Sequence, residues 1–169
     1  SLGDRLVVLN KGQIQQIGKP EEVFAKPVNT FVAKLLGHPQ MNLVNCQVKG
    51  NNGQLQLIGN SGNFSLDVPA QLSQNLNRRS LSNVLVGIRP LHMHVVNDGQ
   101  QNNSCQGKVY VYERLGTKGV LTASIGENKL DVITPIESDF KIDDRVNISI
   151  DNQNITLFDA QTERNILAA

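Results

Sequence analysis

The sequence predicts a mainly β fold of barrel or sandwich type, preceded by a short α/β segment. Short runs with a period of two follow one another after residue 41. Turn clusters rich in Asn and Gly, such as residues 51–53 and 60–62, separate these runs at intervals of ~8–12 residues. The first forty residues differ in pattern: they contain prolines, and part of their apolar residues recur at helical spacing instead of at every second position.

The N-terminal segment predicts a hairpin and two short helices. Residues 5–10 and 13–17 are apolar runs around a Lys-Gly turn. Pro20 and the two glutamates after it suit the first turn of a helix, where a missing N–H and the helix dipole favour them. Residues 30–36 show helical spacing, and Asn29 or Thr30 can cap that helix.

The rest of the chain predicts strands, with Arg78 and Arg79 placed in a polar loop. Residues 97–103 are expected to divide two barrel halves. The expected strands are residues 44–50, 54–59, 63–68, 82–90, 92–96, 106–116, 119–126, 129–135, 145–151 and 155–159.

Composition excludes several classes of protein. The chain has 169 residues, of which 39% are hydrophobic and 18% charged, which is a globular composition. Its 16 basic and 15 acidic side chains leave a net charge of +1, without the basic excess of a nucleic-acid binder. Cys46 and Cys105 are too few for a disulfide framework, so we expect free thiols and a cytosolic location. No apolar window reaches the ~18 residues of a membrane helix.

No catalytic motif is present. The sequence lacks a phosphate loop, a GxGxxG after a strand, a GxSxG elbow and an HExxH pair. We therefore expect no catalytic residue, cofactor or metal in this chain. A metal alternative remains at His92 and His94, which share a face of a predicted strand. A third ligand would come from His38, Cys46, Cys105 or Asp98, and the competing interpretation is two polar residues at a strand end.

Two further groups of side chains have alternative interpretations. Tyr110 and Tyr112 share a predicted strand face, either as a stacking platform for bases or, as we favour, as a pair between core and rim. Arg89 follows an apolar strand and precedes Pro90. It either locks a turn by binding a carboxylate or backbone carbonyls, which we favour, or faces a partner subunit.

The run DRLVVLNKGQIQQIGKPEEVFAKPVNTFVAKLLGHPQMN, residues 4–42, is similar to a family pattern. In that pattern an apolar strand and a Gly turn precede GxPxE(L/V)(Y/F)xxP, FVAxxxG and PxMN. Three shorter motifs of the same family also match. They lie at Gly87-Ile88-Arg89-Pro90, at residues 113–116, and at residues 157–159 with Thr162. The chain thus resembles the C-terminal part of the ATP-binding subunit of an ABC importer, of the carbohydrate-importer type to which the maltose and glycerol-phosphate subunits belong.

The resemblance implies two domains. Residues 1–40 look like the end of the nucleotide-binding domain, and residues 41–169 look like a regulatory domain of OB-type barrels, called TOBE. The motifs that bind and hydrolyse ATP with Mg²⁺ would lie before Ser1, so we expect a piece of a longer ATPase that is itself not catalytic. The implied partners are a twin copy in a homodimer, transmembrane permease subunits and a cytosolic regulator, with no nucleic acid. The implied location is cytoplasmic, on the inner face of the membrane.

The resemblance also selects residues as structural or interface positions, without assigning a binding site. They are Gly87, Ile88, Arg89, Pro90, Glu113 and Gly116. The sequence departs from the family pattern at Leu91, where Glu is usual, and at Thr117 and Lys118, where a Glu is frequent. The alternative function is a stand-alone binder of an oxyanion such as molybdate, for which Ser104, Thr117 and Lys118 would suit.

Overall fold

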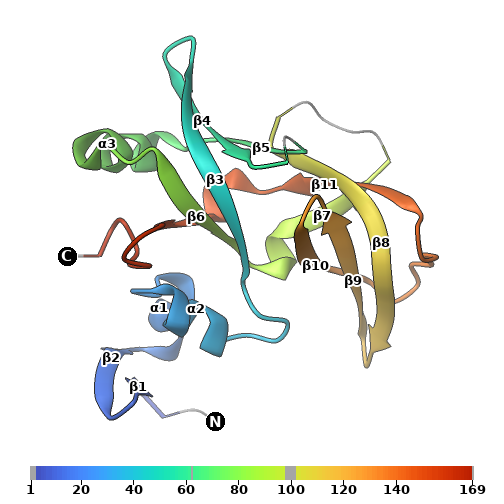
Figure 1. Cartoon of the computed structure of the whole chain (residues 1–169). Coiled ribbons are helices and arrows are strands. Elements are labelled where there is room, and N and C mark those ends of the chain that lie inside the picture. Colours follow the sequence, from blue (N-terminus) through green and yellow to red (C-terminus); the bar gives the residue numbers. More distant parts are fainter. Residues whose placement is uncertain (1–2, 62, 98–101, 169) are drawn as a thin grey trace.

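The computed structural model describes residues 3–61, 63–97 and 102–168. It confirms the mainly β, OB-like fold with a short α/β part at the N-terminal end (Figure 1). The elements are β1 (Leu6–Asn10), β2 (Gln13–Gly18), α1 (Pro20–Ala25), α2 (Thr30–Leu35), β3 (Asn42–Asn51), β4 (Gln54–Gly59), β5 (Phe64–Asp67), α3 (Ala70–Arg79), β6 (Asn83–Ile88), β7 (Met93–Val96), β8 (Ser104–Leu115), β9 (Lys118–Ile125), β10 (Asn128–Pro135), β11 (Arg145–Ile150) and β12 (Thr156–Asp159).

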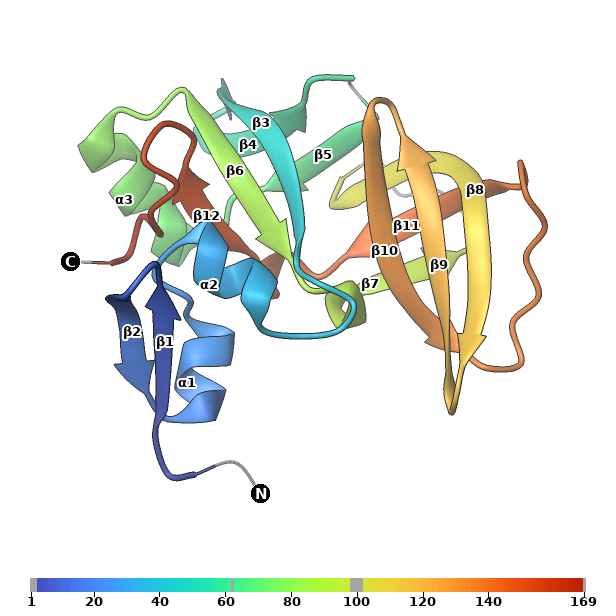
Figure 2. The ribbon, with the colours of Figure 1, turned by 60° about the horizontal axis from the view of Figure 1, so that its bottom comes forward.

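The strands after residue 41 form two antiparallel units. The first β-unit has the strand order β12-β6-β3-β4-β5, and the second has the order β7-β11-β8-β9-β10. Pairing of β5 with β8 joins them into one continuous sheet. Figure 2 shows the two units side by side, with the N-terminal hairpin and helices below the first unit.

The N-terminal unit, residues 6–35, follows the sequence closely. Lys11 and Gly12 have φ angles of 48° and 78°, which is the left-handed backbone of a two-residue hairpin turn. Pro20 begins α1, and the Asn29 side chain caps α2 by accepting the N–H of Val32 at 2.9 Å. Hydrogen bonds and caps within the segment therefore account for its local structure.

The structure corrects the expected loop at Arg78 and Arg79. Arg78 and Arg79 do not lie in a loop, because they form the last turn of α3. The helix buries Leu72 and Leu76, four residues apart, against the main core. The Ser and Asn side chains around this pair favour turns and caps over helix interiors, and they obscured the spacing. The expected divider at residues 97–103 includes 98–101, which lie outside the described residues.

Three hydrophobic clusters hold the molecule together. The largest runs through both β-units, from Val44 to Ile166, and Val8, Val23 and Val32 form a separate cluster in the N-terminal unit. The third contains Ala33 of α2, Met41 and Phe158 of β12, so it joins the helices to the first β-unit. None of the described helices has the length and apolarity needed to cross a bilayer.

Candidate functional site

Arg89 extends from the end of β6 to the ends of two helices. Its Nη1 donates to the carbonyl of Ala33 at 2.9 Å and to that of Leu36, and its Nη2 donates to the carbonyl of Phe24 at 2.9 Å. Carbonyls in the last turn of a helix have no partner within the helix, and the dipole makes that end negative. One guanidinium thus satisfies the C-terminal ends of both α1 and α2 from a strand of the first β-unit.

The Arg89 side chain is buried, with 3% of its surface exposed. Its guanidinium carbon lies 3.9 Å from the centre of the Phe24 ring, a cation–π geometry. Burial lowers the pKa of Arg89 to about 10, so the group keeps its charge at neutral pH. Gly37 has a φ of +105°, and a Cβ there would lie 3.2 Å from Nη1 of Arg89 and 3.3 Å from the Phe24 ring. Glycine at position 37 allows this close approach.

The residues around Arg89 pack the same junction. A Cβ on Gly87 would lie 2.5 Å from the sulfur of Met41 and 2.9 Å from the Phe158 ring, so the strand needs glycine here. Ile88 is fully buried in the main core, and Pro90 starts a 3₁₀ turn that ends at His92. We call the contacts of Arg89 and Gly87 with the helices and Met41 the junction site.

Asn42 makes a second connection, between β3 and the second β-unit. Its Nδ2 donates to the carbonyl of Asp131 at 2.8 Å, and its Oδ1 accepts the N–H of Asp131 at 2.8 Å. The same side chain is 7% exposed. Lys118, at the start of β9, donates from Nζ to the carbonyl of His38 at 3.1 Å. The segment after α2 and the first residue of β3 are therefore each bonded to the second β-unit.

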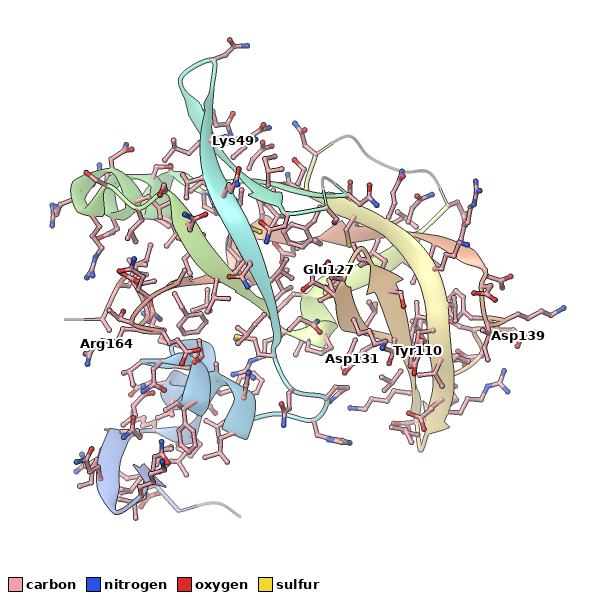
Figure 3. The ribbon with its side chains drawn as sticks, viewed as in Figure 1. Lys49, Tyr110, Glu127, Asp131, Asp139 and Arg164 are labelled. Carbon is pink, nitrogen blue, oxygen red and sulfur yellow. The ribbon has the colours of Figure 1, made fainter. Side chains whose placement is uncertain are left out.

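The C-terminal tail makes a third connection. Asn165 donates from its backbone N–H to the carbonyl of Val28 at 2.9 Å and from Nδ2 to the carbonyl of Pro27 at 2.9 Å. The backbone N–H of Thr30 donates to the carbonyl of Glu163 at 3.1 Å. Figure 3 shows Arg164 of this tail beside α1 and α2. The tail thus bonds to the loop between the two N-terminal helices.

Glu113 and Gly116 lie apart from the junction site, on the β8–β9 hairpin. Gly116 has a φ of +62° and opens a two-residue turn, and Glu113 is exposed on β8. Between them, Arg114 donates to the carbonyls of Ile136 and Ser138 at 3.3 Å and 3.1 Å. The structure does not bring Glu113 and Gly116 together with Arg89.

The structure separates the residues of the metal alternative. His92 belongs to a 3₁₀ turn and only His94 lies in β7, so the two do not share a strand face. Burial raises the pKa of the Cys46 and Cys105 thiols to about 12, and both lie in the core. Asp98 lies outside the described residues, and within 3–61, 63–97 and 102–168 no three His, Cys, Asp or Glu side chains form a metal cluster.

The two tyrosines do not form one platform. A β-bulge at Tyr110 interrupts the alternation of β8, since Val109 pairs with Ala123 while Val111 pairs with Thr122. Tyr112 packs edge-on against Phe140 at 5.2 Å, whereas the exposed Tyr110 ring lies 4.2 Å from Nζ of Lys129. The expectation that both rings lie on one strand face was wrong because of this extra residue.

The residues of the oxyanion alternative are also far apart. Ser104 begins β8 and is buried, whereas Thr117 and Lys118 follow the opposite end of this 12-residue strand. A cavity of about 500 Å³ lies elsewhere, against the junction site. Its lining includes Phe24, Arg89, His92, Asn154 and Asn165.

Comparisons with known proteins match this chain over nearly its whole length. The profile of a family described as the MalK OB fold domain matches residues 37–93. The uncharacterized ABC transporter ATP-binding protein YurJ of Bacillus subtilis is 30% identical, over 96% of this chain and 45% of YurJ. The sn-glycerol-3-phosphate import ATP-binding protein UgpC of Chromobacterium violaceum is 32% identical, over 98% of this chain and 42% of UgpC. The sulfoquinovosyl glycerol transport ATP-binding protein SmoE of Agrobacterium fabrum is 33% identical, over 98% of this chain and 44% of SmoE.

Among solved structures, a crystal form of the cytoplasmic molybdate-binding protein ModG with molybdate bound has a similar fold. The TM-score is 0.54 at 15% identity, covering 69% of this chain and 94% of that one. At this identity the likeness concerns the fold alone. The chain spans less than half the length of the three curated relatives named above. By these matches the chain corresponds to the C-terminal part of the ATP-binding subunits of ABC transporters, and it has an OB-type fold.

Proposed function

We propose that this chain is the regulatory and dimerisation region of the ATP-hydrolysing subunit of an ABC importer for sugars or related solutes. The observation that carries the proposal is the match over 98% of the chain to UgpC and to SmoE, whose names give sn-glycerol-3-phosphate and sulfoquinovosyl glycerol as their solutes. The rest of the subunit would bind ATP and Mg²⁺ and would contact the transmembrane permease subunits. The location in this proposal is the inner face of the membrane.

The three long-range connections made by Arg89, Asn42 and Asn165 give this proposal a mechanism. Arg89, Asn42 and Asn165 each connect parts of the chain that are distant in sequence, so the N-terminal helices and the β-units move as one body. Pairing of the β-units with those of a second copy would then keep two ATPase parts at high effective concentration while they open and close. A cytosolic regulator that binds the β-units would bias that equilibrium.

Two measurements test the proposal. Sedimentation equilibrium of the chain should give twice its 18.5 kDa mass at micromolar concentration, and a monomer throughout would overturn the dimerisation part. Uptake of labelled glycerol phosphate and of a panel of sugars should fail in cells whose importer subunit carries Arg89→Ala and persist with Arg78→Ala. Equal uptake by both variants would overturn the coupling of the junction site to transport.

The second candidate is a stand-alone oxyanion binder, and its weaker support is a likeness in fold alone to ModG, whose structure holds molybdate. Calorimetric titration with molybdate, tungstate and sulfate tests it directly. Heat that saturates at one or two equivalents and is lost in Thr117→Ala or Lys118→Gln would support this candidate. The absence of heat with all three anions would exclude it.

A further inference from the structure

A row of basic side chains crosses the outer face of the second β-unit. The register pairs Lys129 with Ser124, Ser124 with Lys108, and Lys108 with Arg145, across the neighbouring strands β10, β9, β8 and β11. Directly paired residues project from the same face of a sheet. The three cations are exposed, whereas Val109 and Val146, which follow Lys108 and Arg145 along their strands, are buried in the core. The row therefore lies on the solvent side.

The pairing of Lys108 with Arg145 is unfavourable as it stands. Like charges directly opposite each other on neighbouring strands destabilise a sheet. The ion pair found among the described residues joins Arg114 to Asp139, so no described carboxylate lies within 4.0 Å of Lys108 or Arg145. The Asp144 carboxylate, next to Arg145 in the chain, accepts the backbone N–H of Lys141 at 2.9 Å. Among the described residues, therefore, neither Lys108 nor Arg145 forms an ion pair that would offset their repulsion.

A hollow of about 360 Å³ opens over this pair. Side chains that donate hydrogen bonds line it, and no carboxylate is among them. They include Lys108, Arg145, Asn63, Gln106, Ser124 and Asn147. The backbone brings these groups close, because a Cβ on Gly107 would overlap the carbonyl of Ser124 and a Cβ on Gly126 would overlap the Ser61 side chain. Figure 3 shows Glu127, the residue after Gly126, at the end of the β9–β10 hairpin.

We propose that this hollow binds a small oxyanion of the phosphate type, either free or as the phosphate group of a small metabolite. Arg145 offers the planar pair of N–H donors that fits two phosphate oxygens, and Lys108 supplies a second charge from the facing strand. Gln106 and Ser124 provide neutral donors beside them. A dianion between the two cations replaces their repulsion with two attractions. The site uses neither the junction site nor the residues of the molybdate alternative, so it stands independently of the importer function.

Calorimetric titration of the chain with inorganic phosphate at low ionic strength tests the site. We expect saturable binding of one equivalent, and a loss of at least about tenfold in affinity when Lys108→Gln and Arg145→Gln are combined. The matched control combines Arg78→Gln with Arg79→Gln, which removes the same charge from α3 and should leave the affinity unchanged. The absence of saturation by about 10 mM phosphate, or an equal loss in both double variants, would overturn the proposal.

Thermal unfolding gives a second test, because the expected result is a higher melting temperature and a variant that folds poorly would melt at a lower one. In phosphate-free buffer, Lys108→Gln should raise the melting temperature, because it removes the repulsion with Arg145. Added phosphate should raise the melting temperature of the unmodified chain and leave that of Lys108→Gln nearly constant. A variant that melts lower without phosphate, or that responds to phosphate as fully as the unmodified chain, would contradict the site. Repeating the titration with glycerol phosphate distinguishes free phosphate from a phosphate ester.

Discussion

The guanidinium of Arg89 stacks on the ring of Phe24 at 3.9 Å and donates a hydrogen bond to the carbonyl of the same residue at 2.9 Å. The two residues are 65 positions apart, so this double contact links β6 to α1 across more than a third of the chain. A face contact fixes the plane of the guanidinium, and the hydrogen bond fixes its direction within that plane. Together they direct the other N–H groups of Arg89 toward the end of α2.

Replacing Arg89 by Ala should lower the free energy of unfolding by about 2–4 kcal/mol. The change leaves the carbonyls of Phe24, Ala33 and Leu36 without this donor in a buried place. Arg89→Lys should recover part of the loss, since an ammonium reaches one carbonyl but cannot span both helices. Urea unfolding measures both, with Arg78→Ala on the exposed surface of α3 as the control. Equal unfolding midpoints for all variants would contradict the role assigned to Arg89.

Replacing Asn42 by Asp should destabilise the link between β3 and β10 by about 1–3 kcal/mol. The carboxylate keeps the acceptor for the N–H of Asp131 but places a negative oxygen against the carbonyl of that residue. Asn45→Asp is the matched control, because Asn45 lies on the same strand and is exposed. Thermal unfolding at pH 7 should separate the two variants. Identical melting temperatures would show that the Asn42 hydrogen bonds contribute little to stability.

Local patterns in the sequence were sufficient to predict most elements. The alternating runs and Asn-Gly turns indicated the strands, because a period of two and a left-handed turn depend on neighbouring residues. The sequence pattern did not predict the helix α3, because Leu72 and Leu76 are its only buried side chains and the polar residues between them resemble a loop. The bulge at Tyr110 depends on pairing with β9, so the sequence of β8 alone does not predict it.

The contacts of the candidate site could be predicted only in part. Arg89 was selected because a charged residue between an apolar strand and a proline is unusual, and the family resemblance marked the same residue. Its partners were not predictable, because Ala33 lies 56 positions away. Asn42 and Asn165 were missed altogether. They bond to residues 89 and 138 positions distant, and a single Asn in a polar stretch carries no signal of such a partner.

Replacing Gly87 by Ala should lower the free energy of unfolding by about 1–3 kcal/mol through overpacking. The new methyl group would lie 2.5 Å from the Met41 sulfur and 2.9 Å from the Phe158 ring. Combining it with Met41→Ala should cost less than the sum of the two single changes, because the shortened side chain makes room. Gly50→Ala is the control, since a Cβ at Gly50 meets nothing within 4 Å. Strict additivity in the double-mutant cycle would contradict a direct clash with Met41.

Stability should fall as the pH decreases below about 6.5, and His92 should account for part of the loss. Burial lowers the pKa of His92 from its usual value of 6.5; the Asp151 carboxylate opposes this shift, and the charges of His94 and Arg89 add to it. The unfolded chain therefore binds a proton at a higher pH than the folded chain. The stabilisation is fully present above the unfolded pKa and is lost as the pH falls through the folded pKa.

His92→Gln should flatten this part of the pH profile, because the amide does not titrate. Melting temperatures at pH 7.5 and pH 5.5 measure the difference, and His38→Gln, an exposed histidine that does not act on the pKa of His92, is the matched control. We expect the difference in melting temperature between pH 7.5 and pH 5.5 to narrow in His92→Gln and to stay unchanged in His38→Gln. A wider gap in His92→Gln would mean that folding raises the affinity of this ring for protons, through Asp151, and that the pKa of His92 shifts upward instead of downward.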